Sequence, residues 1–458
     1  MKAIADPHGV MANGLAAIRQ QYSVPQDFPP EVMVEAEQAA TRVPGDHADW
    51  TGRHFITLDP AASTDLDQAF LLEQAGNDLI LHYALADVSW FVDEGSALEA
   101  EAWRRGVTLY LPDGKARLYP PVLCEQAASL LPDGPRPAIV ATVRCDPGGK
   151  TVLDGVTRAV IRSREKLGYE STSPDDVPML AEFAARMTAA EQARGAATMS
   201  APDQEMSRAA DGTYSLHVRP WLPSEIANSQ LSLAANIAIA HALQAAGTGL
   251  FREMPPPDDA AIAELRLTAR ALGLTWPDNA TFAQFNRAVD VTTQAGSIFA
   301  LEVRRATGHA RYTPFAEGRV PWHAALGATY THATAPMRRL CDRYVLDAAL
   351  ALSRGKAPPP ADLFVRLGKV MDSASAREGA IERATLDLAE TVLLSGREGE
   401  LFPALVTQLD DRGARIQLCD WPVLARVSGN GLASGDAVRV RLTGVDAARR
   451  QLLFALAD

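Results

Sequence analysis

Short apolar runs separated by turns dominate the chain from about Gly52 to Val160. The runs FITLD, LILHYALADVSWFV, VTLYLP and PAIVATVRC are rich in β-branched and aromatic residues, which is typical of strands. From about Ser224 to Leu394 the apolar residues instead recur at helical spacing, with Ala and Leu prominent, as in SEIANSQLSLAANIAIAHALQAAG. The pattern therefore predicts a sheet-rich part followed by an α-rich part.

The pattern changes again near Ser395. Five short apolar runs follow, separated by the turn sequences DDRG, WP, GNG and DAA, which predicts a small five-stranded barrel of the oligonucleotide-binding (OB) type. We therefore expect an α+β protein in three parts. They are a tail and lead-in helix over residues 1–50, a mixed sheet-and-helix domain over residues 51–395 and an OB-type β-barrel over residues 396–458.

Composition excludes several classes of protein. The chain has 458 residues, of which 47% are hydrophobic, and no run reaches the roughly 18 apolar residues of a membrane span. It also lacks the apolar core of a signal peptide, so we expect a cytoplasmic protein with no membrane partner. The four cysteines are far apart in the sequence and suggest neither a zinc ribbon nor a disulfide framework. The net charge of −12 does not exclude an RNA partner, because only the charge along the substrate path matters.

The stretch FITLDPAASTDLDQAF concentrates acidic residues between apolar ones. Asp65 and Asp67 would point the same way on an extended chain, and the loop from Pro60 to Thr64 can bring Asp59 beside them. Clustered carboxylates repel one another and need a cation, and hard oxygen ligands suit Mg²⁺ or Mn²⁺. The alternative is an ordinary Asp-rich turn with solvated side chains.

A second candidate for chemistry is the segment ATAPMRRLCDRYVLDAALALSRG. Pro336 suits the first turn of a helix and Gly355 suits its exit. Arg338 lies off the apolar stripe of this helix, where a guanidinium can bind phosphate oxygens. The alternative is an ion pair between Arg338 and Asp342, four residues apart on the helix surface.

Four motifs occur in an order and at spacings that resemble the RNB catalytic domain of the ribonuclease II and ribonuclease R family. They are TLDPAASTDLDQA, ALADVSWFVDEGSALEAEAWRRGVTLYLP, AVIRSREKLGYE and YTHATAPMRRLCDRY. The terminal barrel is similar to the S1-type RNA-binding domain of that family. The resemblance implies a monomeric, Mg²⁺-dependent exoribonuclease that degrades single-stranded RNA in the 3′→5′ direction to nucleoside 5′-monophosphates. The residues ahead of the lead-in helix are too few for the cold-shock barrels of the family, so we expect none.

The resemblance assigns metal ligation and orientation of the attacking water to the acidic stretch. Asp59, Asp65 and Asp67 fall on three of the four catalytic aspartates of the family. Gln68 stands at the fourth position, where an amide brings no negative charge. We therefore expect one metal site to be weakened.

Other roles are also implied by the resemblance. Arg338 falls on the catalytic arginine, and Arg339 would be structural or a second phosphate contact. Tyr110 falls on the tyrosine that stacks on bases, and Met199 stands where a partner aromatic is usual. Glu382 falls on an acid that helps to hold the 3′-terminal nucleotide, although a strand-end tyrosine and a solvated helix face are the simpler interpretations of Tyr110 and Glu382.

Two rival functions stay open at this point. The first is a weakened relative that binds RNA without cutting it, which the residues Gln68 and Met199 favour. The second is a phosphodiesterase for short oligoribonucleotides, which the expected absence of N-terminal barrels favours.

Overall fold

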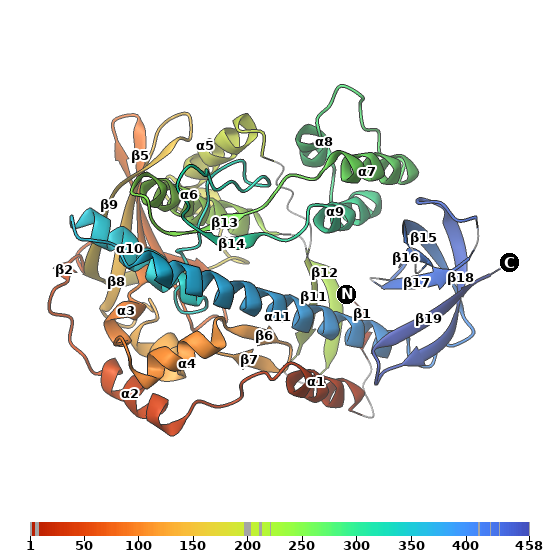
Figure 1. Ribbon diagram of the computed structural model, residues 1–458, viewed down its shortest axis with the longest axis horizontal. Coiled ribbons are helices and arrows are strands. Elements are labelled where there is room, and N and C mark those ends of the chain that lie inside the picture. The colour runs from red at the N-terminus through yellow and green to blue at the C-terminus, as the bar shows by residue number, and fades with distance from the viewer. Residues whose placement is uncertain are drawn as a thin grey trace.

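The computed structural model describes residues 2–4, 9–196, 203–209, 213–219, 221–410, 413–421, 423–429 and 431–457. A seven-stranded sheet forms the centre of the molecule (Figure 1). Most neighbouring strands are antiparallel. The two edge strands are the exceptions, because β10 is parallel to its neighbour β3 and β2 is parallel to its neighbour β9. In spatial order the strands are β10 (Ser163–Gly168), β3 (Phe55–Asp59), β4 (Gln68–Ala75), β5 (Asp78–Ala86), β8 (Arg136–Cys145), β9 (Thr151–Ile161) and β2 (Ala48–Asp49).

Both faces of this sheet are covered, which explains why β5 reads as an unbroken apolar run. Leu81, Tyr83 and Leu85 face the main core, which also contains residues of α6 (Pro223–Ala245) and α10 (Leu340–Ser353). Ala84 faces the other side and belongs to a smaller core. A strand buried on both faces shows no polar alternation.

A single long helix joins the central domain to the C-terminal barrel. Helix α11 (Ala361–Leu394) runs from beside the sheet to the barrel (Figure 1). The apolar stripe that the sequence predicts on this helix is buried, and its members are Ile381, Ala384, Leu388 and Val392.

The C-terminal part is a closed five-stranded barrel, as the sequence predicted. It has its own apolar core, separate from that of the central domain. Its strands are β15 (Leu401–Asp410), β16 (Gly413–Leu418), β17 (Leu424–Ser428), β18 (Ala437–Asp446) and β19 (Gln451–Leu456), in the order β15-β16-β17-β19-β18. The mixed α+β fold class is therefore confirmed.

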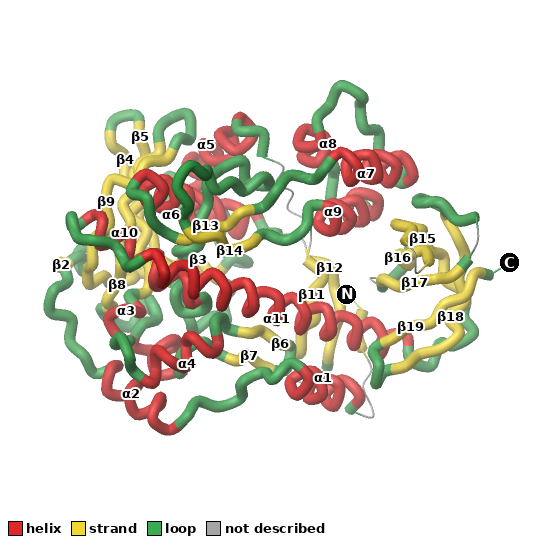
Figure 2. The backbone as a smooth tube through the Cα atoms, in the orientation of Figure 1, coloured by secondary structure: helices red, strands yellow, loops and turns green. Residues whose placement is uncertain are grey.

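The remaining elements lie around the sheet and between it and the barrel (Figure 2). The helices are α3 (Val88–Phe91), α4 (Ala97–Arg105), α5 (Leu180–Ala193), α7 (Asp259–Ala271), α8 (Phe282–Ala288) and α9 (Gln294–Ala306). The strands are β6 (Leu109–Leu111), β7 (Gly114–Ala116), β11 (Asp203–Arg208), β12 (Tyr214–Arg219), β13 (Leu250–Glu253) and β14 (Arg311–Pro314). No helix among the described residues is both long and apolar enough to cross a membrane.

Two elements differ from the sequence-based expectation. The N-terminal region contains strand β1 (Lys2–Ile4), which pairs with β12, and two helices, α1 (Val10–Gln21) and α2 (Pro30–Ala40), rather than one. The helix expected from Pro336 begins only at Leu340. Residues 336–339 are instead held in a turn by contacts with distant parts of the chain.

Candidate active site

The loop between β3 and β4 carries the acidic residues and is fixed by side chains from outside it. Lys166 Nζ donates to the carbonyl oxygens of Ala61 (2.8 Å) and Ser63 (2.6 Å). Ser129 Oγ accepts a hydrogen bond from the backbone N–H of Leu66 at 2.9 Å. Because β3 and β4 are antiparallel neighbours, the end of one and the start of the other lie at the same edge of the sheet.

Asp59 and Asp67 meet at this edge. Asp59 is the last residue of β3, and Asp67 directly precedes β4 and is 7% exposed. The Asp59 carboxylate accepts no hydrogen bond and forms no ion pair among the described residues. The Asp67 carboxylate accepts a hydrogen bond from the backbone N–H of Met337 at 2.7 Å and lies 3.6 Å from Nε of Arg338.

Burial destabilises the charged form of both carboxyl groups when no cation is bound. Burial raises the pKa of Asp59 to about 7, and repulsion from Asp67 adds to this effect while Arg338 opposes it. Burial likewise raises the pKa of Asp67 to about 7, against the opposing effects of Arg338 and of the Met337 N–H. Buried carboxyls with raised pKa values gather at sites that bind cations or move protons.

Asp65 takes a different partner from Asp67. Its Oδ1 atom lies 2.8 Å from Nζ of Lys115, which also lies 3.1 Å from Oε1 of Glu125. Residues 60–67 do not form a strand, so the two-residue periodicity on which the expected common direction of Asp65 and Asp67 depended does not apply. Asp65 remains near enough to raise the pKa of Asp59.

Gln68 is held by hydrogen bonds to distant parts of the chain. Its Nε2 atom donates to the carbonyl oxygen of Thr334 at 2.6 Å. Its Oε1 atom accepts a hydrogen bond from the hydroxyl of Tyr83, and Oγ of Ser232 lies 2.6 Å from that hydroxyl and 3.3 Å from Oε1. Burial raises the pKa of Tyr83 far above its usual range, so this hydroxyl stays protonated and remains a donor.

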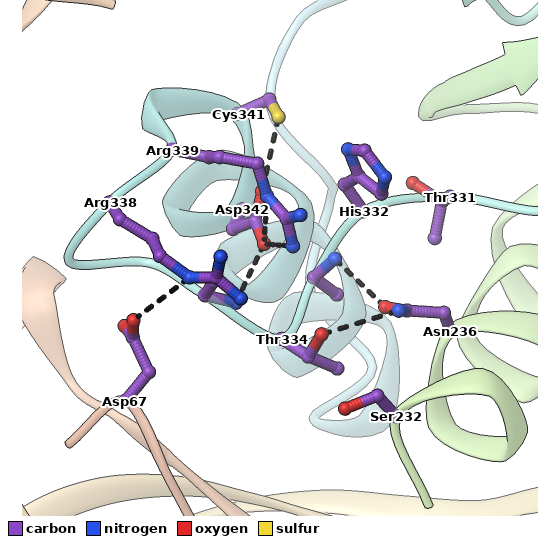
Figure 3. A network of polar contacts seen from close by, with 12 residues as sticks. Asp67, Ser232, Asn236, Thr331, His332, Thr334, Arg338, Arg339, Cys341 and Asp342 are labelled. Atoms are coloured by element: carbon purple, nitrogen blue, oxygen red, sulfur yellow. Dashed lines mark hydrogen bonds and ion pairs between the residues drawn. The ribbon is translucent and has the colours of Figure 1, made fainter. Parts of the chain in front are cut away.

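The turn that carries Arg338 is anchored from several directions (Figure 3). Asn236 Oδ1 on α6 accepts from the backbone N–H of Ala333 at 2.9 Å, and Gln68 binds the next residue, Thr334. On the other side, the backbone N–H of Thr108 donates to the carbonyl of Arg338 at 2.9 Å. These contacts fix the backbone, while the Arg338 side chain stays 46% exposed.

Arg339 and Asp342 form the internal support of this turn. The Arg339 guanidinium donates to both carboxylate oxygens of Asp342, with Nη2 at 2.7 Å from Oδ2. Asp342 is fully buried and also accepts from the backbone N–H of Ala335 at 2.7 Å. The alternative pair of Arg338 with Asp342 is therefore wrong, because Arg339 occupies that carboxylate and Arg338 turns toward Asp67 (Figure 3).

The residues expected to contact RNA are not all beside the carboxylates. Tyr110 on β6 is 52% exposed and close enough to Arg338 to interact with its charge. Glu382 is exposed on α11. Met199 lies outside the described residues. The roles of these three residues stay predictions.

A cavity of about 420 Å³ opens beside the site. Its lining includes Gln68, Thr334, Arg338 and Arg339 on one side and polar residues of α6 on the other. The volume lies within the usual range of ligand pockets in proteins. The arrangement thus places the guanidinium of Arg338, which faces Asp67, at the wall of this cavity.

The donor set fits a divalent ion of the hard type. Asp59 and Asp67 offer carboxylate oxygens, which Mg²⁺ and Mn²⁺ prefer. The unpaired Asp59 carboxylate and the raised pKa values of both groups show a local excess of negative charge that the neighbouring arginine leaves incompletely compensated.

Sequence reasoning missed Lys115 and the hydrogen-bond partners of Gln68. A signal for Lys115 was present in LYLPDGK, because a hairpin that turns at Pro112–Asp113 pairs Tyr110 with Lys115 and places both on one face. Tyr83 and Ser232 reach Gln68 from β5 and α6. No local pattern signals contacts between segments so far apart in the sequence.

Comparison with known proteins agrees with this geometry. Residues 47–351 match the RNB domain family, and residues 400–457 match the RNase II-type exonuclease C-terminal S1 domain. Ribonuclease R of Aquifex aeolicus is 24% identical over 96% of this chain, and ribonuclease R of Thermotoga maritima is 25% identical over 88%. This chain spans 70% of the first relative, 61% of the second and 54% of ribonuclease R 1 of Lactococcus lactis.

Solved structures share the fold. RNase R of Mycoplasma genitalium in complex with ribose-methylated single-stranded RNA matches 99% of this chain and 79% of that chain, with a TM-score of 0.84 at 19% identity. A yeast pseudonuclease matches 97% of this chain and 59% of that chain, with a TM-score of 0.69 at 18% identity. The RNB match covers two thirds of the residues and includes Asp59, Asp67 and Arg338, and the chain therefore belongs to the RNB family, with a C-terminal S1 domain.

Proposed function

We propose that this protein is a 3′→5′ exoribonuclease that hydrolyses single-stranded RNA to nucleoside 5′-monophosphates with the help of Mg²⁺. The observation that carries the proposal is the meeting of Asp59 and Asp67 with the exposed guanidinium of Arg338, which lines a cavity of about 420 Å³. Membership of the RNB family and the relatives named ribonuclease R support the same activity.

Asp59 and Asp67 would hold the divalent ion. A bound Mg²⁺ or Mn²⁺ ion lowers the pKa of water and neutralises charge on a phosphate. The backbone N–H of Met337 orients the Asp67 carboxylate, because it donates to Oδ1 and leaves Oδ2 toward Arg338. The hydrogen bond thus fixes which oxygen faces the arginine.

Arg338 would stabilise the charge that develops on the phosphate. Its guanidinium is half exposed while its backbone is fixed by Thr108, so the group can reach a substrate without losing its position. Planar guanidinium groups bind two phosphate oxygens at once. Tyr110 would stack on a base near the site, which grips RNA without sequence preference.

The proposal is tested with 5′-labelled oligoadenylate. In the presence of Mg²⁺ the labelled strand should shorten one nucleotide at a time from its 3′ end, and unlabelled nucleoside 5′-monophosphates should accumulate. EDTA and Asp67→Asn should each stop the reaction. Asp93→Asn is the matched control, because Asp93 is 64% exposed in a surface pair with Arg42. An RNA that stays intact with every divalent ion would overturn the proposal.

A second candidate is RNA binding without hydrolysis. It is favoured by the neutral amide of Gln68 and by the ion pair of Asp65 with Lys115, which both reduce the negative charge available to metal ions. This candidate predicts salt-sensitive binding of single-stranded RNA and no release of mononucleotides in the same assay.

A further inference from the structure

At the acidic loop, Lys115 stands in place of a second cation and Gln68 stands in place of one of its ligands. Three carboxylates stand at Asp59, Asp65 and Asp67, and the position after them is Gln68. One carboxylate, Asp65, is neutralised by Lys115. Asp59 and Asp67 therefore remain as the carboxylates without a fixed cation, because Arg338 approaches Asp67 only to 3.6 Å and its side chain is 46% exposed. Two carboxylates balance a single divalent ion.

Lys115 is held where it stands. Its ammonium lies 2.8 Å from Asp65 and 3.1 Å from Glu125, and Glu125 is itself held by Arg117 at 2.6 Å. The Lys115 side chain is 21% exposed, so the protein around it restricts its motion. A fixed positive charge at this carboxylate repels a second divalent ion and at the same time removes the attraction that would hold it.

Gln68 is held by partners other than a metal ion. Its Oε1 atom accepts a hydrogen bond from the Tyr83 hydroxyl, which itself lies 2.6 Å from Oγ of Ser232, so this oxygen faces two hydroxyl groups. Its Nε2 atom faces the carbonyl oxygen of Thr334, which can only accept. A carboxylate at position 68 would set an acceptor against an acceptor there, so the surroundings of this residue fit an amide.

The contact with Thr334 gives Gln68 a different task. Thr334 lies four residues before Arg338 in the same turn, and the hydrogen bond ties this turn to the first residue of β4, directly after Asp67. The amide therefore couples the position of the arginine to that of the carboxylates.

We propose that this site holds a single divalent ion on Asp59 and Asp67, that Lys115 takes the place of a second cation, and that Gln68 is a positioning residue for Arg338. The inference rests on the proposed function for the identity of the ion. It is tested by counting ions, which needs no RNA hydrolysis. If the protein binds one ion and degrades no RNA, the proposed function fails and this inference stands.

The first experiment is a calorimetric titration of the full chain with Mn²⁺, with the bound ion counted independently by electron paramagnetic resonance. The wild-type protein should bind one ion per chain. Lys115→Met, which leaves the Gln68 contacts intact, should bind Mn²⁺ about tenfold more tightly, because one nearby positive charge is removed. Lys356→Met, in the exposed loop between α10 and α11, is the matched control and should behave as the wild type.

Two ions in the wild-type protein, or unchanged affinity in Lys115→Met, would overturn the proposal. Thermal melting of each variant establishes that it is folded. Gln68→Ala separates positioning from ligation. It should leave the Mn²⁺ dissociation constant within about twofold of the wild type and lower kcat more than it changes KM, whereas a tenfold weaker ion affinity would mean that Gln68 is a ligand.

Discussion

The buried pair of Arg339 and Asp342 should be the main support of the Arg338 turn, and Asp342→Asn tests this. The substitution keeps the size of the side chain and an oxygen that can accept from Ala335, but it removes the negative charge. Asp342 is 0% exposed, and the guanidinium of Arg339 makes contacts of 2.7 and 3.0 Å with it. Arg339 would then be a buried cation without a counter-ion.

The magnitude follows from the burial of the pair. Removing one partner of a buried ion pair costs about 3–5 kcal/mol, mainly because the other charge stays buried. Unfolding entropy of about 2.1 cal/mol/K per residue gives roughly 0.7 kcal/mol/K for a domain of this size, so Tm should fall by about 4–7 °C. The matched control Asp93→Asn makes the same chemical change in an exposed pair with Arg42, where Tm should fall by about 1 °C or less.

The assay is a thermal unfolding scan of the wild type and both variants at one pH and scan rate. The double variant Arg339→Met/Asp342→Leu should recover much of the lost stability, because removing both charges of a buried pair is often close to neutral. If Asp342→Asn melts within about 1 °C of Asp93→Asn, the buried pair does not support the turn and the reasoning is refuted.

Three further predictions follow from other parts of the molecule. Because the pKa values of Asp59 and Asp67 are raised to about 7, binding of the ion should release protons. Mg²⁺ should therefore bind more weakly at pH 6 than at pH 8, by up to roughly tenfold per pH unit for each proton released. Calorimetry in two buffers counts the released protons, and equal affinity at both pH values would contradict the raised pKa values. Tyr110→Ala should weaken binding of single-stranded RNA by about 1–3 kcal/mol through lost base stacking, measured by fluorescence anisotropy, and an unchanged Kd would remove Tyr110 from the RNA path. Gly106→Ala should lower Tm by several degrees, because Gly106 has φ +73° and the added Cβ would lie 2.8 Å from the Cβ of Ala374. A Tm equal to that of the wild type would show that α11 moves away to make room for the added Cβ.

The sequence alone determined the class of fold and the chemistry of the acidic stretch. The change from short β-branched runs to helical spacing and back to short runs marks a sheet, a helical part and a barrel, because each element must bury its apolar face with its own period. The stripe on α11 is buried as its spacing predicts. The residues Asp59, Asp67 and Arg338 were also identified from motifs, and the fold brings them together.

Only the tertiary structure decided which partner each charged or polar side chain takes. Arg339 rather than Arg338 binds Asp342, Lys115 binds Asp65, and the amide of Gln68 joins β4 to the arginine turn. A charge acts over a few ångströms in space, and the two partners can be hundreds of residues apart, as Gln68 and Thr334 are at 266. Local sequence patterns report the period of an element and the chemistry of a side chain, whereas the choice among several nearby acids and bases depends on the packing that fixes their distances and on the burial that sets the cost of an unpaired charge.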